Sequence, residues 1–204
     1  AEHGGSGLHI HASAYRDDGR NVFAHGEATT PPTLTEPLRH AVGGLVRTVR
    51  EAMLIFAPTP NSYRRFTPGA VAPAVPNWGF DHREVALRIP ASGEQNRRVE
   101  HRIAGADANP YFVLAAVLAG IHHGLENRID PGEPVGRETD LSDANVSFPT
   151  RMELALALFR EGRIIPDYLG TDFVRAFATQ RAGESDLYHA QVPDLDYEWY
   201  LRAI

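Results

Sequence analysis

The chain has 204 residues, of which 43% are hydrophobic and 23% are charged, and its formal net charge is -6. This composition is typical of a folded globular protein, and the negative charge argues against nucleic acid as a partner because phosphate binding needs a basic surface. Cysteine is absent and all 20 Lys and Arg residues are arginine, which excludes disulfides, thiolate metal sites, and catalysis by a cysteine or lysine of this chain.

The sequence contains no pattern of a membrane span or a secretory signal. The longest apolar run, from Tyr111 to Ile121, is too short to cross a bilayer. The chain does not open with a basic stretch followed by an apolar one. We therefore expect a cytoplasmic protein with no membrane partner.

The first part of the chain predicts a strand, a helix and an irregular loop. Apolar and polar residues alternate over 8–15, which favours a strand. Apolar residues at helical spacing predict a helix over 37–57, with Thr35 as its N-cap and Pro37 in its first turn. The many prolines and glycines of 57–79 predict a long loop without regular structure, and such loops are often functional.

The rest of the chain predicts two short strands followed by helices. Residues 84–90 and 97–104 have strand patterns. Residues 109–129 predict a long, mostly buried helix, with Asn109 at the N-cap and Pro110 after it. Further helices are expected at 151–162, 171–190 and 194–204. This order of elements predicts an α+β fold. The aromatic residues of the last helix could pack within the chain or against another copy.

Two histidines lie on one face of the first predicted strand. Residues two apart on a strand share a face, so His9, His11 and Ser13 point the same way. Imidazoles in this arrangement can coordinate a cation or contact a phosphate. A polar strand face in solvent has the same pattern, so both interpretations stay open.

A carboxylate lies between two arginines in 97–104. Glu100 shares a strand face with Arg98 and Arg102. It is either the centre of a structural ion-pair ladder or an oxygen ligand for Mg²⁺ or Mn²⁺, with the arginines holding anionic groups. More arginines occur in the preceding segments: Arg64, Arg65, Arg83 and Arg88. Together they suggest a highly anionic ligand, such as a nucleotide with a phosphorylated intermediate.

Four segments together resemble the catalytic domain of the glutamine synthetase superfamily. They are GSGLHIHAS (5–13), NSYRRFTPG (61–69), REVALRIP (83–90) and RRVEHRIAGADANPY (97–111). Within the superfamily, AEHGGSGLHIH, VEHRIAGADANPY and YEWYL are most similar to the γ-glutamylpolyamine or γ-glutamylputrescine synthetase branch. The resemblance implies antiparallel strands of a partial open barrel packed on helices, with a helical C-terminal region. It also implies that residues 1–204 are the C-terminal part of the catalytic domain, without the N-terminal β-grasp domain and the first half of the catalytic domain.

The resemblance implies a role for each residue that matches a family motif. The ligands of a divalent cation, Mg²⁺ or Mn²⁺, would be His9 and Glu100. The contacts to ATP would come from His11, Ser13, Arg88 and Arg98. The glutamate substrate would be held by Gly5, Arg65, Arg83 and Arg102. Of these, Arg83 and Arg102 would also be catalytic.

The reaction implied by the resemblance is an ATP-dependent ligation. The γ-carboxylate of glutamate takes the γ-phosphoryl group of ATP, and an amine then displaces phosphate. Gly4 stands where ammonia-using members usually carry asparagine, and Val71 stands where they carry a flap glutamate. The resemblance therefore favours a polyamine or another organic amine as the acceptor. The intact protein would be a homo-oligomer of stacked rings, such as a dodecamer, and residues 1–204 alone are expected to be inactive.

Three alternatives stay open at this stage. The parent protein could be a glutamine synthetase that uses ammonia. It could instead be a non-catalytic member that keeps the scaffold for assembly or ligand binding, although the joint presence of His9, Glu100 and the arginines favours a catalytic parent. A histidine–carboxylate metal hydrolase or oxygenase would need a third ligand near His9 and explains none of the arginines.

Overall fold

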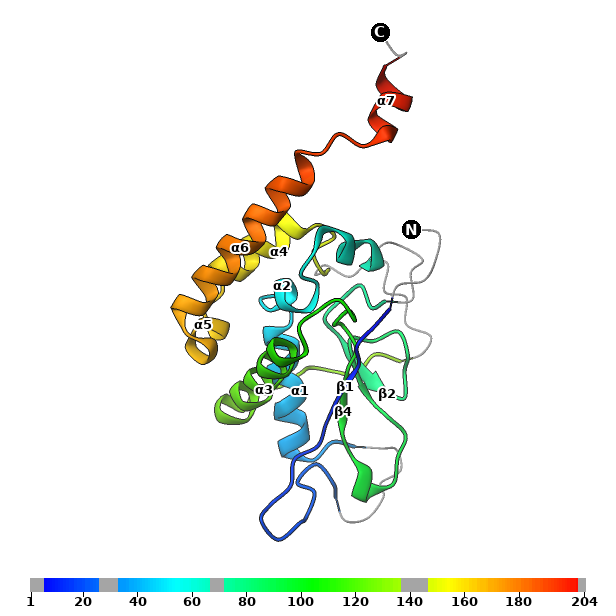
Figure 1. The fold of residues 1–204 in the computed structure, drawn as a ribbon. Coiled ribbons are helices and arrows are strands. Elements are labelled where there is room, and N and C mark those ends of the chain that lie inside the picture. The colour runs from blue at the N-terminus through cyan, green and yellow to red at the C-terminus, as the bar shows by residue number, and fades with distance from the viewer. Residues whose placement is uncertain (1–5, 26–32, 67–71, 137–146, 202–204) are drawn as a thin grey trace.

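The computed structural model describes residues 6–25, 33–66, 72–136 and 147–201, which form a small sheet with helices on one side of it (Figure 1). The strands are β1 (Ile10–Ala12), β2 (Trp78–Phe80), β3 (Leu87–Ile89) and β4 (Val99–His101). The helices are α1 (Glu36–Thr48), α2 (Met53–Phe56), α3 (Pro110–Asn127), α4 (Met152–Glu161), α5 (Ile164–Leu169), α6 (Thr171–His189) and α7 (Asp194–Tyr200). Two short 3₁₀ helices are η1 (Pro60–Phe66) and η2 (Glu94–Asn96). The predicted α+β fold, with an open sheet packed on helices, is confirmed.

The sheet has the strand order β1-β4-β3-β2 and is mixed. β4 is antiparallel to both β1 and β3, as expected, whereas β2 and β3 are parallel. The parallel pair arises because the chain turns at Asp81, where φ is 44°, and then returns to place Leu87 beside Trp78. The expectation of antiparallel strands therefore holds for two of the three strand pairs.

The register of the sheet brings three predicted site residues together. Glu100 in β4 is paired with His11 in β1 and with Arg88 in β3. Directly paired residues on neighbouring strands project to the same side of a sheet. The opposite side faces the core, where Leu87 and Val99 are fully buried. Because successive strand residues point to opposite sides, the strands that place apolar residues in the core also place these polar residues on the other side of the sheet.

Helices α1 and α3 pack closely against each other behind the sheet. Both predicted N-caps are confirmed, because the Thr35 side chain accepts a hydrogen bond from the Leu38 N–H and the Asn109 side chain accepts one from the Tyr111 N–H. Burial of α3 is less complete than expected, since one face leaves Tyr111 79% and Leu118 62% exposed.

Two local predictions are wrong, and one helix was not predicted. The single helix expected over 37–57 is divided into α1 and α2, and the hydroxyl of Thr48 donates to the carbonyl of Gly44 where α1 ends. The proline-rich segment contains η1 and β2, although it was expected to lack regular structure. Helix α5 was not expected at all. Short elements of this kind depend on tertiary packing more than on their own pattern.

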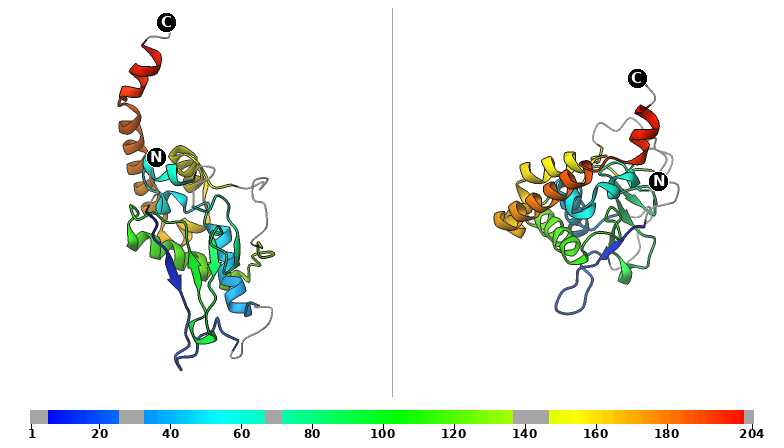
Figure 2. Two further views of the ribbon diagram at one scale, coloured as in Figure 1. Left: turned by 90° about the vertical axis from the view of Figure 1, so that its right-hand side faces the viewer. Right: turned by 45° about the horizontal axis from the view of Figure 1, so that its top comes forward.

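The end of α6 and helix α7 extend away from the rest of the chain (Figure 2). Helix α4 packs against α6. Helix α7 lies beyond the end of α6 and has no buried residue. The aromatic side chains of α7 are therefore exposed and do not pack into the core, with Trp199 at 62%. No helix in the described ranges is long and apolar enough to span a membrane.

Candidate active site

Glu100 is the centre of a buried ionic cluster at the middle of the sheet. Its Oε2 accepts a hydrogen bond from Arg88 Nη1 at 3.1 Å, and its Oε1 accepts one from Arg102 Nη1 at 2.8 Å. His9 Nδ1 lies 3.0 Å from the same Oε1. The Glu100 side chain is only 4% exposed. The structure thus brings together His9, Arg88, Glu100 and Arg102, four of the residues singled out from the sequence.

The cluster keeps its carboxylate charged and its imidazole neutral. Burial alone would raise the pKa of Glu100, but the charges of Arg102 and Arg88 hold that pKa below its usual value. Burial and the charge of Arg102 lower the pKa of His9, although Glu100 opposes this shift. An ionised carboxylate and a neutral imidazole are the forms that bind metal ions.

His9 and Glu100 fit a divalent cation as two of its ligands. They offer one imidazole nitrogen and one carboxylate oxygen, whereas Mg²⁺ usually takes six ligands. Within the ranges that the structure covers, no group of three or more His, Asp or Glu side chains could hold a metal ion. The pair can therefore form part of a metal site whose other ligands come from elsewhere.

Residues beside the cluster form an exposed polar edge along β1. Arg98 Nε donates to His11 Nδ1 at 3.1 Å, and Arg98 Nη1 donates to the carbonyl of Asn96 at 2.9 Å. The Ser13 hydroxyl donates to the carbonyl of Arg97 at 3.3 Å. His11 and Ser13 are exposed, so their polar groups are accessible to a ligand.

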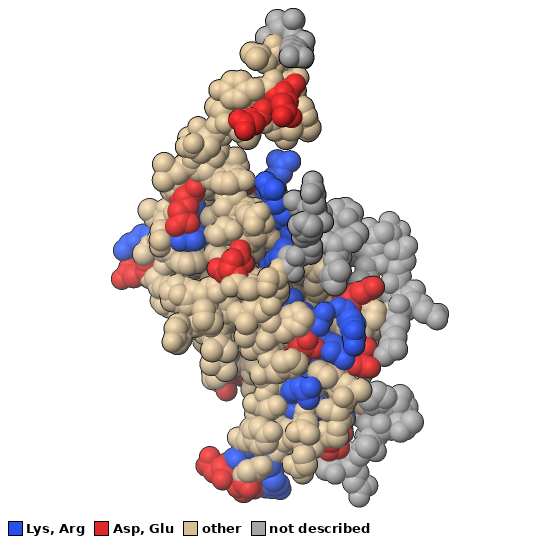
Figure 3. Space-filling view, turned by 45° about the vertical axis from the view of Figure 1, so that its right-hand side comes forward, with Lys and Arg blue, Asp and Glu red and all other residues tan. Residues whose placement is uncertain are grey.

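The remaining predicted residues lie outside the cluster or outside the described ranges. The exposed Arg83 lines a cavity of about 430 Å³ together with Arg88. Arg65 lies at the end of η1, where its Nη2 donates to the carbonyl of Ile103 at 3.1 Å. Gly5, like Gly4 and Val71, lies outside the described residues. In the view of Figure 3, arginine and carboxylate side chains lie side by side among the described residues and do not form a broad basic surface.

Two groups of residues near the site were not identified from the sequence. Asp81 forms an ion pair with Arg88 Nη2. Asp107 accepts hydrogen bonds from the hydroxyls of Ser62, at 2.5 Å, and Thr59, at 3.3 Å. Thr59 and Ser62 also cap each other's backbone N–H groups at the start of η1, so this Thr-x-x-Ser spacing was a detectable signal. Asp81 had no such signal, because its partner is brought near by the chain reversal.

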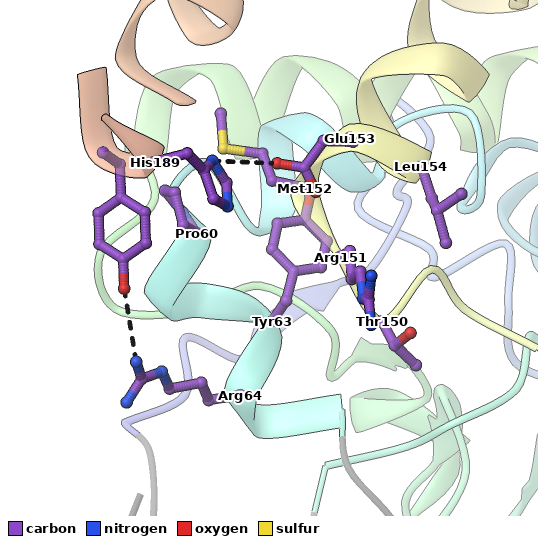
Figure 4. A pocket seen from close by; sticks show the side chains of 10 residues that line it. Pro60, Tyr63, Arg64, Thr150, Arg151, Met152, Glu153, Leu154 and His189 are labelled. Atoms are coloured by element: carbon purple, nitrogen blue, oxygen red, sulfur yellow. Dashed lines mark hydrogen bonds and ion pairs between the residues drawn. The ribbon is translucent and has the colours of Figure 1, made fainter. Parts of the chain in front are cut away.

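A larger cavity of about 730 Å³ lies between η1 and helices α4 and α6 (Figure 4). Arg64 Nη2 donates to the hydroxyl of Tyr188 at 3.4 Å across it, and Glu153 lies 3.7 Å from His189 Nδ1. None of the residues that line it belongs to the Glu100 cluster. The cavity was not expected from the sequence, since its walls come from segments far apart in the chain.

His101 follows Glu100 but faces the opposite side of the sheet. It is 1% exposed and its ring packs 4.5 Å from that of Phe56. Neither ring nitrogen has a hydrogen-bond partner among the described residues. Burial lowers the pKa of His101 to about 3, so the imidazole is neutral in the folded chain.

Replacing His101 with leucine is expected to reduce the sensitivity of the fold to acid. The pKa of His101 is lower in the folded chain than in the unfolded one, so protonation favours the unfolded chain as the pH falls below about 6.5. This group alone should lower the free energy of unfolding by about 2 kcal/mol between about pH 7 and about pH 5. Urea titrations at both pH values should show that His101→Leu loses this part of the pH dependence. An unchanged pH dependence in the variant would contradict the assignment.

Comparisons of the chain with known proteins show its family and its relatives. The family described as "Glutamine synthetase, catalytic domain" matches residues 1–200. Gamma-glutamylputrescine synthetase PuuA of Escherichia coli K12 is 39% identical over 201 residues, which cover 98% of this chain and 42% of PuuA. Gamma-glutamylethanolamide synthetase GlnA4 of Streptomyces coelicolor is 35% identical over 97% of this chain and 40% of GlnA4. Glutamate–isopropylamine ligase of a Pseudomonas species is 33% identical over 100% of this chain and 44% of that protein.

Solved structures support the same assignment. GmaS without ligand aligns with a TM-score of 0.82 and 25% identity, covering 97% of this chain and 45% of GmaS. A GmaS complex with ADP aligns with a TM-score of 0.83 and 26% identity, covering 96% of this chain and 46% of that chain. The chain thus spans less than half the length of these relatives. It belongs to the glutamine synthetase catalytic-domain family.

Proposed function

We propose that residues 1–204 are the C-terminal part of the catalytic domain of an ATP-dependent ligase that joins the γ-carboxylate of glutamate to an organic amine. The observation that carries this proposal is the buried cluster in which the Glu100 carboxylate contacts the side chains of Arg88, Arg102 and His9. One carboxylate facing two guanidinium groups and an imidazole leaves a local excess of hydrogen-bond donors. Such a site suits a bound cation together with an anionic ligand, and perturbed ionisable groups gather at functional sites.

The names of the relatives support the substrate classes. Two of them are synthetases named for γ-glutamyl products of putrescine and ethanolamine, and a third is a ligase named for glutamate and isopropylamine. The GmaS complex contains ADP, which supports a nucleotide as the second ligand class. We propose a polyamine or another organic amine as the acceptor, because Gly4 and Val71 replace the residues that ammonia-using members usually carry.

The proposed reaction has two steps. An oxygen of the glutamate γ-carboxylate bonds to the γ-phosphorus of ATP, and ADP leaves. The amine nitrogen then bonds to the γ-carboxyl carbon of γ-glutamyl phosphate, phosphate leaves with that oxygen, and the proton lost by the nitrogen is taken up by phosphate or solvent. Phosphoryl transfer needs mainly positioning and neutralisation of charge, which arginines and hydrogen-bond donors can supply.

Different residues of the chain bind the metal ion, the nucleotide and glutamate in this proposal. Mg²⁺ or Mn²⁺, held by His9, Glu100 and ligands from outside the described residues, would neutralise phosphate charge when bound. The nucleotide is bound by His11, Ser13, Arg88 and Arg98. Glutamate is held by Gly5, Arg65, Arg83 and Arg102. Of these, Arg83 and Arg102 also stabilise the charge of the transferring phosphoryl group.

We further propose that the intact protein is a cytoplasmic homo-oligomer of stacked rings. The end of α6 and all of α7 expose large apolar side chains, with Leu187 at 71%, Trp199 at 62% and Leu201 at 73%. Exposed apolar surface of this kind is typical of protein–protein contacts. It supports assembly of the natural protein through its C-terminal helices.

Phosphate release by the natural protein that contains this chain tests the function. With glutamate, ATP and Mg²⁺, we expect release that depends on an added amine and that is faster with putrescine, a longer polyamine or ethanolamine than with ammonium. Omitting glutamate should abolish it. Ammonium as the best acceptor would overturn the proposed organic amine. No release with any amine would overturn the ligase itself and favour a non-catalytic scaffold.

A further inference from the structure

The guanidinium group of Arg88 is held between two carboxylates from different segments. Its Nη1 donates to Glu100 in β4, and its Nη2 forms an ion pair with Asp81 in the turn after β2. The Arg88 side chain is 20% exposed, and its Nε is buried without a hydrogen-bond partner in the described part of the chain. The orientation of this group is therefore set by its two Nη atoms.

The backbone around Asp81 fixes the position of its carboxylate. Asp81 has a φ of 44°, a left-handed conformation that aspartate adopts more readily than most residues. Its N–H donates to the carbonyl of Ile89 at 2.9 Å, which ties it to the residue that follows Arg88. A charge-assisted hydrogen bond that the guanidinium donates to a carboxylate held in this way can keep the guanidinium in one plane. Asp81 is also the main reason why the pKa of Arg88 is raised.

We propose that Asp81 is a positioning residue that keeps the Arg88 guanidinium directed at the nucleotide phosphates. This inference rests on the nucleotide-binding role proposed above for Arg88. Asp81 and Arg88 line the same cavity of about 430 Å³, which leaves Arg88 accessible from that side.

Asp81 also limits how strongly Arg88 pairs with Glu100, because it engages the second Nη atom of Arg88. Oε1 of Glu100 already contacts Arg102 and His9, and its Oε2 contacts Nη1 of Arg88. Without Asp81, Arg88 Nη2 could turn to Glu100 as well, and a bidentate pair would compete more strongly with a cation for this carboxylate. Loss of Asp81 should therefore weaken binding of nucleotide with its metal ion, and not binding of glutamate.

The variants Asp81→Gly and Asp81→Asn separate the carboxylate from the backbone. Glycine adopts a φ of 44° without strain, so it removes the side chain alone. Asparagine also accepts this conformation and retains one oxygen as an acceptor, but it removes the charge. In the natural protein, we expect the KM for ATP to rise about tenfold in Asp81→Gly and about threefold in Asp81→Asn, since a charge-assisted bond is lost or weakened.

Three measurements accompany these variants. The kcat and the KM for glutamate should stay within about twofold of wild type, and calorimetry with ADP and Mg²⁺ should show the same loss of affinity as the KM for ATP. Asp130→Asn, which alters an ion pair with Arg39 away from the site, is the matched control and should leave all these values unchanged. A KM for ATP within about twofold of wild type in Asp81→Gly would overturn the inference.

A double-mutant cycle with Arg88→Ala shows whether Asp81 acts through Arg88. If it does, adding Asp81→Gly to Arg88→Ala should change ADP affinity by less than about twofold. A further tenfold loss would overturn the positioning role. Unchanged ADP affinity in Arg88→Ala would overturn the role proposed for Arg88 as well. A loss in Arg88→Ala without any loss in Asp81→Gly would overturn the inference on Asp81 alone.

Discussion

Glu100→Gln in the natural protein is expected to lower kcat/KM for ATP by about 100-fold or more, equivalent to about 2.7 kcal/mol of transition-state stabilisation. The amide removes the negative charge that faces Arg88, Arg102 and His9, and it is a poor ligand for a divalent cation. Binding of Mn²⁺ with ADP should weaken in parallel. Steady-state kinetics and calorimetry measure the two effects.

The stability of the same variant distinguishes a functional cluster from a structural ladder. Removing one partner of a buried ion pair can lower the free energy of unfolding by about 3–5 kcal/mol. In Glu100→Gln, however, the glutamine oxygen still accepts a hydrogen bond, and Arg88 keeps its ion pair with Asp81. We therefore expect the variant to remain folded at assay temperature. Glu94→Gln is the matched control, because Glu94 pairs with the buried Arg97 outside the cluster. It should lose stability but keep activity. If activity falls in proportion to stability in both variants, Glu100 is the centre of a structural ion-pair ladder and not of a functional cluster.

Gly44→Ala is expected to destabilise the fold by about 3 kcal/mol. A Cβ at Gly44 in α1 would lie 2.1 Å from the carbonyl oxygen of Gly120 and 2.5 Å from the backbone nitrogen of Gly124, both in α3. Because these atoms belong to the backbone, the two helices would have to separate. Urea unfolding of the chain followed by circular dichroism measures the loss.

Gly183→Ala is the matched control for this prediction. Gly183 lies within α6, and a Cβ there would meet nothing within 4 Å. Alanine is the better helix former by about 0.5–1 kcal/mol, so this variant should be slightly more stable than wild type. A Gly44→Ala variant that unfolds within about 1 kcal/mol of wild type would contradict the close contact of α1 and α3.

The parts of the fold that local chemistry determines could be predicted from the sequence. The caps at Thr35 and Asn109 are signals within a few residues of the helices they begin, and both are confirmed. Alternation along 97–104 placed Glu100 on the face opposite to the buried Val99 and His101. The same alternation did not reveal that His101 lacks hydrogen-bond partners, because this depends on what packs over it.

The parts that depend on long-range contacts could not be predicted. The parallel pairing of β2 with β3 follows from the turn at Asp81, which has no distinctive pattern. The contact of Gly44 with α3 joins residues more than seventy positions apart. Likewise, the sequence predicted Arg88 and Glu100 as site residues individually, whereas the ion pair with Asp81 appears only once the chain has reversed.

An isotope-transfer experiment tests the proposed ligase chemistry most directly. The natural protein that contains this chain is given ATP, Mg²⁺, the best amine acceptor, and glutamate labelled with ¹⁸O in its γ-carboxylate. If the carboxylate attacks the γ-phosphorus and the amine then displaces phosphate, each inorganic phosphate should carry one ¹⁸O atom, and the amount of phosphate should equal that of γ-glutamyl amide. Phosphate without ¹⁸O, released in the presence of all substrates, would contradict the account.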